Sequence, residues 1–347
     1  MISQTPALDE TWVEAFLTVF DMCKVTRDQQ VIILSETASR PVNVALAGLA
    51  LSRMGVPYFH LQVPTPRPEP GPIVRSTGAS MALTGQDAAV KALAASDLIV
   101  DLTVEGLMHA RETADILKSG ARIMNVSNEH PEALARLVPT PDLKDKVKEA
   151  VGRCRSAERM TVHSDAGTDL TVTMTGAATV GIWGWTDRPG TLAHWPGGII
   201  VSFPAKASVN GRLAFKPGDI NLTFKRYFES TVTFTLTDDY VTGIEGRGSE
   251  ARLMRAYLDG FGDRQAYATS HVGWGLNPGA RYEALEMYDK ADTNGTELRA
   301  VPGNFLYSTG ANEFAGRFTR GHFDLPMMDC TIALDGTVVV DKGVLVS

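Results

Sequence analysis

Residues 321–326 read GHFDLP and place an imidazole and a carboxylate two positions apart, at His322 and Asp324. Alternate side chains of an extended segment share a face, so this pair points one way while Phe323 and Leu325 point the other way. Such a pair on a rigid strand could supply two ligands of a metal site. A hydrogen-bonded histidine and aspartate on the protein surface would produce the same short pattern.

A third candidate ligand is His271, in the stretch TSHVGWGLNPGA at residues 269–280. Three glycines in this stretch permit backbone turns that other residues resist, which suggests a fixed position for the imidazole. A structural histidine at a turn is the alternative. With His322 and Asp324 it completes two imidazoles and one carboxylate, the ligand set of non-haem Fe(II) oxygenases. The set by itself also allows zinc or manganese.

Length, composition and charge favour a globular protein over one that binds nucleic acid or spans a membrane. The chain has 347 residues, 44% hydrophobic and 21% charged, a length that favours two globular domains. The net charge of −7 and the absence of a Lys/Arg cluster argue against a nucleic-acid partner. No apolar run approaches the roughly 18 residues of a membrane span. The first residues lack a secretory pattern and the three cysteines are scattered, so we expect a cytoplasmic protein.

The first part of the chain predicts a doubly wound, Rossmann-like α/β domain over residues 1–155. Short apolar runs typical of buried strands alternate with helical segments, which indicates a parallel sheet covered on both faces. The expected strands are 31–36, 56–63, 97–104 and 121–127, and the expected helices are 42–55, 87–96 and 111–120. No G-x-G-x-x-G follows the first strand, so a dinucleotide site has little support. A helix over 142–158 should connect the two halves.

Residues 156–347 predict an α+β domain with antiparallel hairpins that carries the metal site. Alternating Thr, Val and Ile flank Asp-containing turns in three places, a pattern typical of β-hairpins. These places are 159–176, 230–246 and 327–346. One amphipathic helix over 249–262 interrupts the strands.

Several segments resemble the 2,5-dihydroxypyridine 5,6-dioxygenases of bacterial nicotinate degradation, in matching order over nearly the whole chain. They are AASDLIVDLT, ILKSGARIM, HWPGGIIVSFP (194–204), GDI (218–220), SHVGWGLNP, GNFLYSTGAN (303–312) and HFDLPMMDC (322–330). The resemblance implies an Fe(II) cofactor on His271, His322 and Asp324. It also implies a reaction with O₂ that opens 2,5-dihydroxypyridine between carbons 5 and 6 to N-formylmaleamate.

The resemblance also implies roles around the substrate. His194 would lie near the substrate as an acid or base, with packing beside Trp195 as the alternative role. His109 follows the strand 97–104 and could reach over the iron from the first domain, or it could face water at a helix start. Ser308 would donate a hydrogen bond to the substrate, with a simple turn serine as the alternative. From their residue types, Trp195, Trp274 and Phe305 could form apolar walls that exclude water, or they could belong to the core. The remaining partner we expect is a second copy of the chain, in a homo-oligomer.

One position departs from the family pattern. Family members carry a glutamate that faces the substrate two residues before the glycine matching Gly184, and Ile182 stands there in this chain. An isoleucine cannot accept a hydrogen bond. Either another acid takes this role or the substrate differs from 2,5-dihydroxypyridine.

Two other functions stay open. The chain also resembles metal-dependent aminopeptidases in a pattern E-x-G-x-G-x-N-P, but His271 replaces their bridging glutamate, and Gly197 and Gly198 replace an acidic pair. Two histidines and one aspartate are too few for two cations about 3.5–4 Å apart. The hydrolase alternative is therefore an enzyme with a single metal ion. A non-catalytic binding protein that kept the scaffold is the third possibility.

Overall fold

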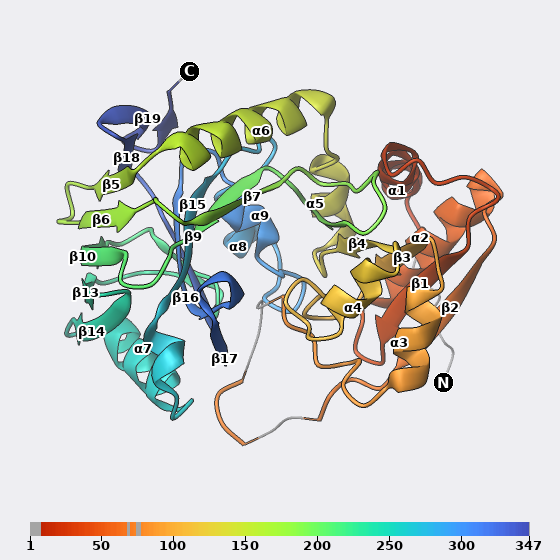
Figure 1. Ribbon diagram of the computed structural model, residues 1–347, viewed down its shortest axis with the longest axis horizontal. Helices are drawn as coiled ribbons and strands as arrows, with labels where there is room; N and C mark the ends of the chain where they lie inside the picture. The colour runs from red at the N-terminus through yellow and green to blue at the C-terminus, as the bar shows by residue number, and fades with distance from the viewer. Residues whose placement is uncertain (1–7, 68–69, 74–77, 347) are drawn as a thin grey trace.

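The computed structural model describes residues 8–67, 70–73 and 78–346, and Figure 1 shows how its elements are arranged. The first third of the chain forms one side of the molecule and most of the remainder forms the other. Helix α6 (Pro141–Ser156) runs along the top and joins them, close to the predicted connecting helix 142–158. In the described ranges no helix is both long and apolar enough to cross a membrane.

A five-stranded parallel sheet in the order β2-β1-β3-β4-β8 organises the first half. Its strands are β1 (Val31–Glu36), β2 (Tyr58–Val63), β3 (Leu98–Asp101), β4 (Arg122–Val126) and β8 (Leu192–Trp195). The first four strands confirm the predicted pattern. The fifth, β8, comes from beyond the predicted boundary at residue 155 and pairs parallel with β4.

Helices cover both faces of this sheet, as the continuous apolar strands indicate. On β1, Ile33 packs into the cluster formed with α1, α2 and α5, whereas Ile32 packs into the cluster formed with α3 and α4. The helices are α1 (Glu10–Met22), α2 (Pro41–Met54), α3 (Asp87–Ala94), α4 (Thr113–Lys118) and α5 (Pro131–Arg136). The order 2-1-3-4 places the reversal of strand order between β1 and β3, where ligands of open α/β sheets bind.

The second half contains two antiparallel sheets. The first, in the order β14-β13-β10-β6-β5-β18-β19-β20, comprises β5 (Arg159–His163), β6 (Asp169–Thr173), β10 (Val209–Phe215), β13 (Val232–Thr237), β14 (Tyr240–Glu245), β18 (Thr331–Leu334), β19 (Thr337–Asp341) and β20 (Val344–Leu345). The second, in the order β17-β16-β15-β9-β7, comprises β7 (Ala178–Ile182), β9 (Ile199–Phe203), β15 (Thr269–Gly275), β16 (Phe305–Asn312) and β17 (Arg317–Met327). The three predicted hairpins are confirmed as β5–β6, β13–β14 and β18–β19.

Short elements complete this half. They are the pair β11 (Ile220–Asn221) and β12 (Arg226–Tyr227), the helices α7 (Ser249–Asp259), α8 (Ala284–Met287) and α9 (Thr296–Arg299), and the 3₁₀ turns Arg264–Tyr267 and Glu313–Ala315. Helix α7 confirms the amphipathic helix predicted over 249–262.

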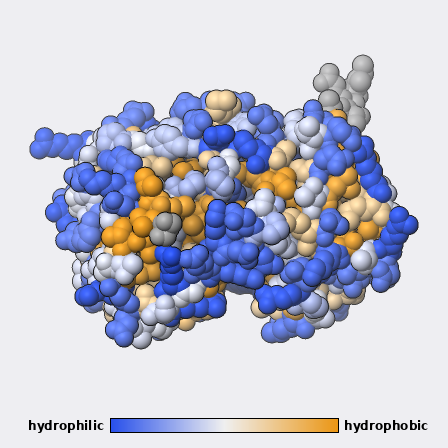
Figure 2. Space-filling view, turned by 90° about the horizontal axis from the view of Figure 1, so that it is seen from above, coloured by the Kyte–Doolittle hydropathy of each residue, from blue (hydrophilic) through white to orange (hydrophobic). Residues whose placement is uncertain are grey.

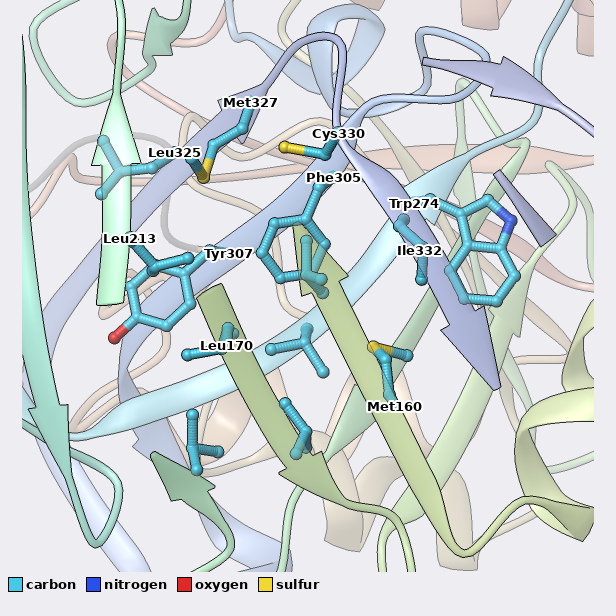
Figure 3. Close-up of a cluster of buried hydrophobic side chains, with 14 of the residues drawn as sticks. Met160, Leu170, Leu213, Trp274, Phe305, Tyr307, Leu325, Met327, Cys330 and Ile332 are labelled. Carbon is cyan, nitrogen blue, oxygen red and sulfur yellow. The ribbon is translucent and has the colours of Figure 1, made fainter. Parts of the chain in front are cut away.

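The two antiparallel sheets pack face to face around one hydrophobic core. Figure 3 shows Met160 and Leu170 of the larger sheet close to Phe305 and Tyr307 of the smaller one. Because side chains alternate across a strand, the opposite face of the smaller sheet points away from this core. That opposite face carries the candidate site.

A buried ion pair ties the two sheets together. Arg317, at the start of β17, lies 2.7 Å from Asp239 in the β13–β14 turn and also donates to the Thr269 carbonyl at 2.6 Å. Asp239 in turn accepts hydrogen bonds from the backbone N–H groups of Ser208 and Val209. Both charges are therefore paired and hydrogen-bonded, as a buried pair requires.

We expect Arg317→Met to lower the free energy of unfolding by about 3–5 kcal/mol, because it leaves the Asp239 carboxylate buried without its partner. Lys342→Met is the matched control, since the Lys342–Asp165 pair is exposed, and it should change stability by no more than about 0.5 kcal/mol. Urea unfolding followed by fluorescence measures both. Equal losses in the two variants would contradict a structural role for the buried pair.

Candidate metal centre

Three predicted ligands lie together on the outer face of the smaller antiparallel sheet. Across the described residues, His271, His322 and Asp324 are the group that could hold a metal ion, and each offers one ligand atom within 4.8 Å of the others. His271 Nε2 lies 3.6 Å from Asp324 Oδ1, and His322 Nε2 lies 3.3 Å from Asp324 Oδ2. Two atoms that each bind one ion at about 2.0–2.2 Å lie roughly 3–4 Å apart, so the separation of His271 Nε2 and Asp324 Oδ1 fits a shared ion.

Strand alternation explains why these side chains meet. On β17, Phe323 and Leu325 enter the sandwich core, so His322 and Asp324 point the other way. On β15, Val272 and Trp274 enter the same core, so His271 also faces outward. Strand β16 lies between β15 and β17 and sets their spacing.

Arg299 is the counter-ion of Asp324. Its Nε and Nη2 atoms lie 2.7 and 2.5 Å from Asp324 Oδ2. Burial opposes ionisation of Asp324, but Arg299 and then His322 outweigh it and hold the pKa of Asp324 well below its usual range. Burial lowers the pKa of His271 to about 3, which keeps this imidazole neutral at pH 7. Carboxylate and neutral imidazole are the protonation states that metal ions bind.

Two polar atoms of this group have no hydrogen-bond partner in the described part of the chain. They are Asp324 Oδ1 and His271 Nδ1, and both are buried. Buried polar atoms are normally satisfied, so an unpartnered carboxylate oxygen beside two imidazoles points to a ligand that is not a protein group. Arg299 occupies Oδ2, which leaves Oδ1 for that ligand.

The first half of the chain positions Arg299. Glu129, in the loop after β4, accepts hydrogen bonds from the backbone N–H groups of Gly295 and Thr296, each at 2.8 Å. Gly295 has φ +99°, a conformation that favours glycine, and helix α9 begins directly after it. Arg299 is the last residue of this four-residue helix. No local pattern in the sequence marks Glu129 or Arg299, so neither residue was predicted.

A small cavity of about 80 Å³ lies in front of the three ligands. His109, in the loop after β3, and His194, on β8, both line it, so the two predicted catalytic histidines do face the candidate centre. The His109 ring lies 6.0 Å from the His322 ring, and its Nδ1 lies 3.5 Å from Glu313 Oε1. The apolar lining consists of Met108, Ile182, Ile199, Val201, Phe203 and Leu306.

His194 has one ring nitrogen engaged. Its Nδ1–H donates to the Pro196 carbonyl at 3.2 Å, which leaves Nε2 as the acceptor nitrogen. Burial lowers the pKa of His194 to about 4, so the imidazole is neutral at pH 7.

Comparison with known proteins identifies the family. A family model of 2,5-dihydroxypyridine 5,6-dioxygenase matches residues 11–347. The 2,5-dihydroxypyridine 5,6-dioxygenase of Pseudomonas putida KT2440 is 36% identical over 347 residues, which cover 99% of this chain and 98% of that protein. The chain belongs to the 2,5-dihydroxypyridine 5,6-dioxygenase family.

Solved structures agree with this assignment. The 2,5-dihydroxypyridine dioxygenase from Pseudomonas putida KT2440 superposes with a TM-score of 0.92 at 34% identity, covering 99% of both chains. AmpT from Thermus thermophilus superposes with a TM-score of 0.65 at 13% identity, covering 98% of this chain and 100% of that one. At 13% identity the likeness to AmpT shows a common fold alone.

The position at which the resemblance implies a glutamate lines the cavity. Ile182, at the end of β7, lines the cavity wall, so no carboxylate is present at that point. Glu105, in the loop after β3, is the one acid besides Asp324 among the described lining residues. It is the candidate for the substituting acid.

Ser308 lies beside His322. It is fully buried on β16, with Oγ 3.4 Å from His322 Nε2, and it is not among the residues that line the cavity. Its contact is therefore with a candidate ligand, and the predicted hydrogen bond to the substrate stays a prediction.

Trp195, Trp274 and Phe305 are core side chains, the alternative role considered for them, and are not among the described residues that line the cavity. Trp195 is fully buried on the helix side of β8, where its indole N–H donates to the Leu137 carbonyl at 2.8 Å. Trp274 and Phe305 lie in the sandwich core. Side chains an odd number of positions apart on one strand point to opposite faces of the sheet. Trp195 is one position from His194, Trp274 is three from His271, and Phe305 is one from the lining residue Leu306, so each of the three points away from the cavity. Aliphatic side chains and Phe203 form the walls instead.

Gly197 and Gly198 allow close packing of the backbone against neighbouring segments. Close approach of a substrate would be another reason for two glycines at these positions. A Cβ on Gly197 would lie 2.3 Å from the Trp183 carbonyl carbon. A Cβ on Gly198 would lie 2.5 Å from the Asn277 Cβ. The segment that carries His194 is therefore held against neighbouring backbone by close contact.

We expect Gly197→Ala to destabilise the protein by about 1–3 kcal/mol, because the added methyl overlaps backbone that cannot move aside independently. Gly152→Ala is the matched control: it lies in α6 with nothing within 4 Å of the new Cβ, and should stabilise by about 0.5–1 kcal/mol. Thermal unfolding of the two variants checks both signs. A neutral Gly197→Ala would show that this contact does not fix the segment.

Proposed function

We propose that this chain is an Fe(II)-dependent dioxygenase that opens the ring of a hydroxylated pyridine. The model reaction is that of 2,5-dihydroxypyridine with O₂, cleaved between carbons 5 and 6 to N-formylmaleamate with both oxygen atoms incorporated. One observation carries the proposal: in a member of this family, two imidazole nitrogens and one carboxylate oxygen meet at a buried cavity. This is the facial set of non-haem Fe(II) oxygenases.

The residues present fit a ferrous ion. His271 Nε2, His322 Nε2 and Asp324 Oδ1 are the atoms that would hold it, and Oδ1 has no other partner in the described chain. Arg299 keeps Oδ2 engaged, so Asp324 would bind through one oxygen. Ferrous iron supplies the one-electron chemistry with O₂ that amino-acid side chains lack.

The side chains around the centre would handle the substrate. The aliphatic walls exclude water and pack on the ring. His194 Nε2, the acceptor nitrogen of this imidazole, would accept a proton from a ring hydroxyl. His109 would orient a second polar atom of the ring, because its Nδ1 is held by Glu313 from the β16–β17 turn. A homo-oligomeric state and a cytoplasmic location stay predictions.

The hydrolase alternative has less support. Apart from Asp324, the described lining residues include one carboxylate, that of Glu105, whereas a two-metal site needs several. The relation to AmpT is one of fold.

We expect anaerobic Fe(II) to raise the melting temperature of the protein and to bind at one ion per chain, because binding to the native state stabilises it by mass action. The loaded protein should then consume O₂ with 2,5-dihydroxypyridine, and ultraviolet absorbance should follow the loss of the ring. His322→Ala should abolish the shift in melting temperature and the O₂ uptake.

His163→Ala is the control, since this histidine is exposed on β5 and pairs only with the exposed Asp169. It should behave as the wild type. Two ions per chain, iron retained by His322→Ala, or turnover of an aminoacyl amide with zinc alone would each refute the dioxygenase proposal. A melting temperature that does not change when Fe(II) is added would favour a non-catalytic binding role.

We expect His194→Asn to lower kcat by about 10²–10⁴-fold with a smaller change in KM, because the amide nitrogen can still donate to the Pro196 carbonyl while the Nε2 base is lost. Steady-state O₂ uptake measures both constants, with His163→Asn as the control. An unchanged kcat would mean that another group takes the proton.

A further inference from the structure

A second and larger cavity adjoins the candidate centre. It has a volume of about 710 Å³, within the range of roughly 300–1,000 Å³ typical of small-molecule sites. Its walls come from α4, from β7 and β8, and from the turn between β16 and β17. Figure 2 shows the molecule as two lobes with a notch between them at one edge.

The two cavities adjoin each other and share part of their lining. Six residues line both of them: Met108, His109, Ile182, His194, Val201 and Phe203. The two histidines are those of the candidate centre, and the other four side chains are apolar. A substituent that extends from a ring at the candidate ligands toward the larger cavity would therefore meet apolar side chains, among them Ile182 and Val201.

The larger cavity offers apolar contact. Trp183, Leu117 and Val180 are part of its lining. Its carboxylates are already paired, Asp187 with Lys24 and Lys144, and Glu313 with His109.

The cationic side chains of this lining lie at its rim. Arg111 and Arg188 are both exposed to solvent. A buried group of the ligand in this cavity must therefore be apolar, because few unengaged polar partners face it.

We infer that the substrate is a hydroxylated pyridine bearing an apolar substituent, such as an alkyl chain or a second ring, which occupies the 710 Å³ cavity. The inference rests on the proposed function. The small cavity of about 80 Å³ at the iron ligands holds the reacting edge of the ring, and the larger cavity selects the substituent.

The test compares 2,5-dihydroxypyridine with its 3-butyl and 4-butyl derivatives, using O₂ uptake by the Fe(II)-loaded protein. Each methylene that enters an apolar pocket favours its substrate by about 10-fold or more. We expect kcat/KM for at least one butyl derivative to exceed that of the parent at least 10-fold. A ratio at or below one overturns the inference, and it is the result expected if a second copy of the chain fills the cavity instead.

Val180→Trp fills the larger cavity from β7 without contact with the iron ligands. It should lower kcat/KM for the preferred butyl derivative at least 10-fold and leave that for 2,5-dihydroxypyridine within twofold. Leu253→Trp on α7 is the matched control, because Leu253 and Val180 are both 39% exposed, and it should change neither constant. Ala114→Trp, from the opposite wall, repeats the test if Val180→Trp fails to fold.

Equal effects of Val180→Trp on both substrates, in a variant that still binds Fe(II), overturn the inference. Absence of O₂ uptake with all three pyridines refutes the proposed function itself, and the inference with it. Uptake with the parent alone leaves the proposed function standing and removes only the inference about the substituent.

Discussion

Side-chain alternation across β15, β16 and β17 positions both the sandwich core and the candidate site. One face of these strands supplies Trp274, Phe305 and Tyr307 to the sandwich core, and the other supplies the three candidate ligands. A register slip of one residue would exchange the two sets and bury the ligands among aromatic side chains. The packing that stabilises the core therefore also fixes the positions of the ligand atoms, because both sets of side chains stand on the same strands.

Charge balance is the second requirement of the site. A buried carboxylate is costly without compensation, and Asp324 is compensated by Arg299. Arg299 stands on α9, whose first N–H groups are held by Glu129 from the loop after β4. The Arg136–Glu297 ion pair fixes the same short helix from the first half of the chain. The electrostatics of the centre thus depend on contact between the two halves.

Local sequence patterns predicted most of the secondary structure and part of the candidate site. They did not predict the features that depend on contacts between segments far apart in the chain. The hairpins and the helices were predictable, because period and turn residues act over a few positions. The His322–Asp324 pair was predictable from strand alternation. The same rule would have turned Trp274 away from His271, three positions before it on one strand, and Trp195 away from its neighbour His194. The pairing of β8 with β4 and the Arg299–Asp324 contact join distant segments, and no local signal marks such contacts.

A fold does not by itself determine the chemistry of the site that it carries. The charges in the cavity determine how many metal ions the site can hold. The negative charge of Asp324 is balanced by the positive charge of Arg299, and the imidazoles of His271 and His194 are neutral. A single divalent cation can be held by such a set, whereas a second would meet the Arg299 guanidinium with Glu105 as the one other carboxylate in the described lining. Walls of Ile182, Val201 and Phe203 disfavour the water that hydrolysis consumes and suit an aromatic ring and O₂. The same residues that leave the site short of negative charge therefore make it suitable for oxygen chemistry on an uncharged ring.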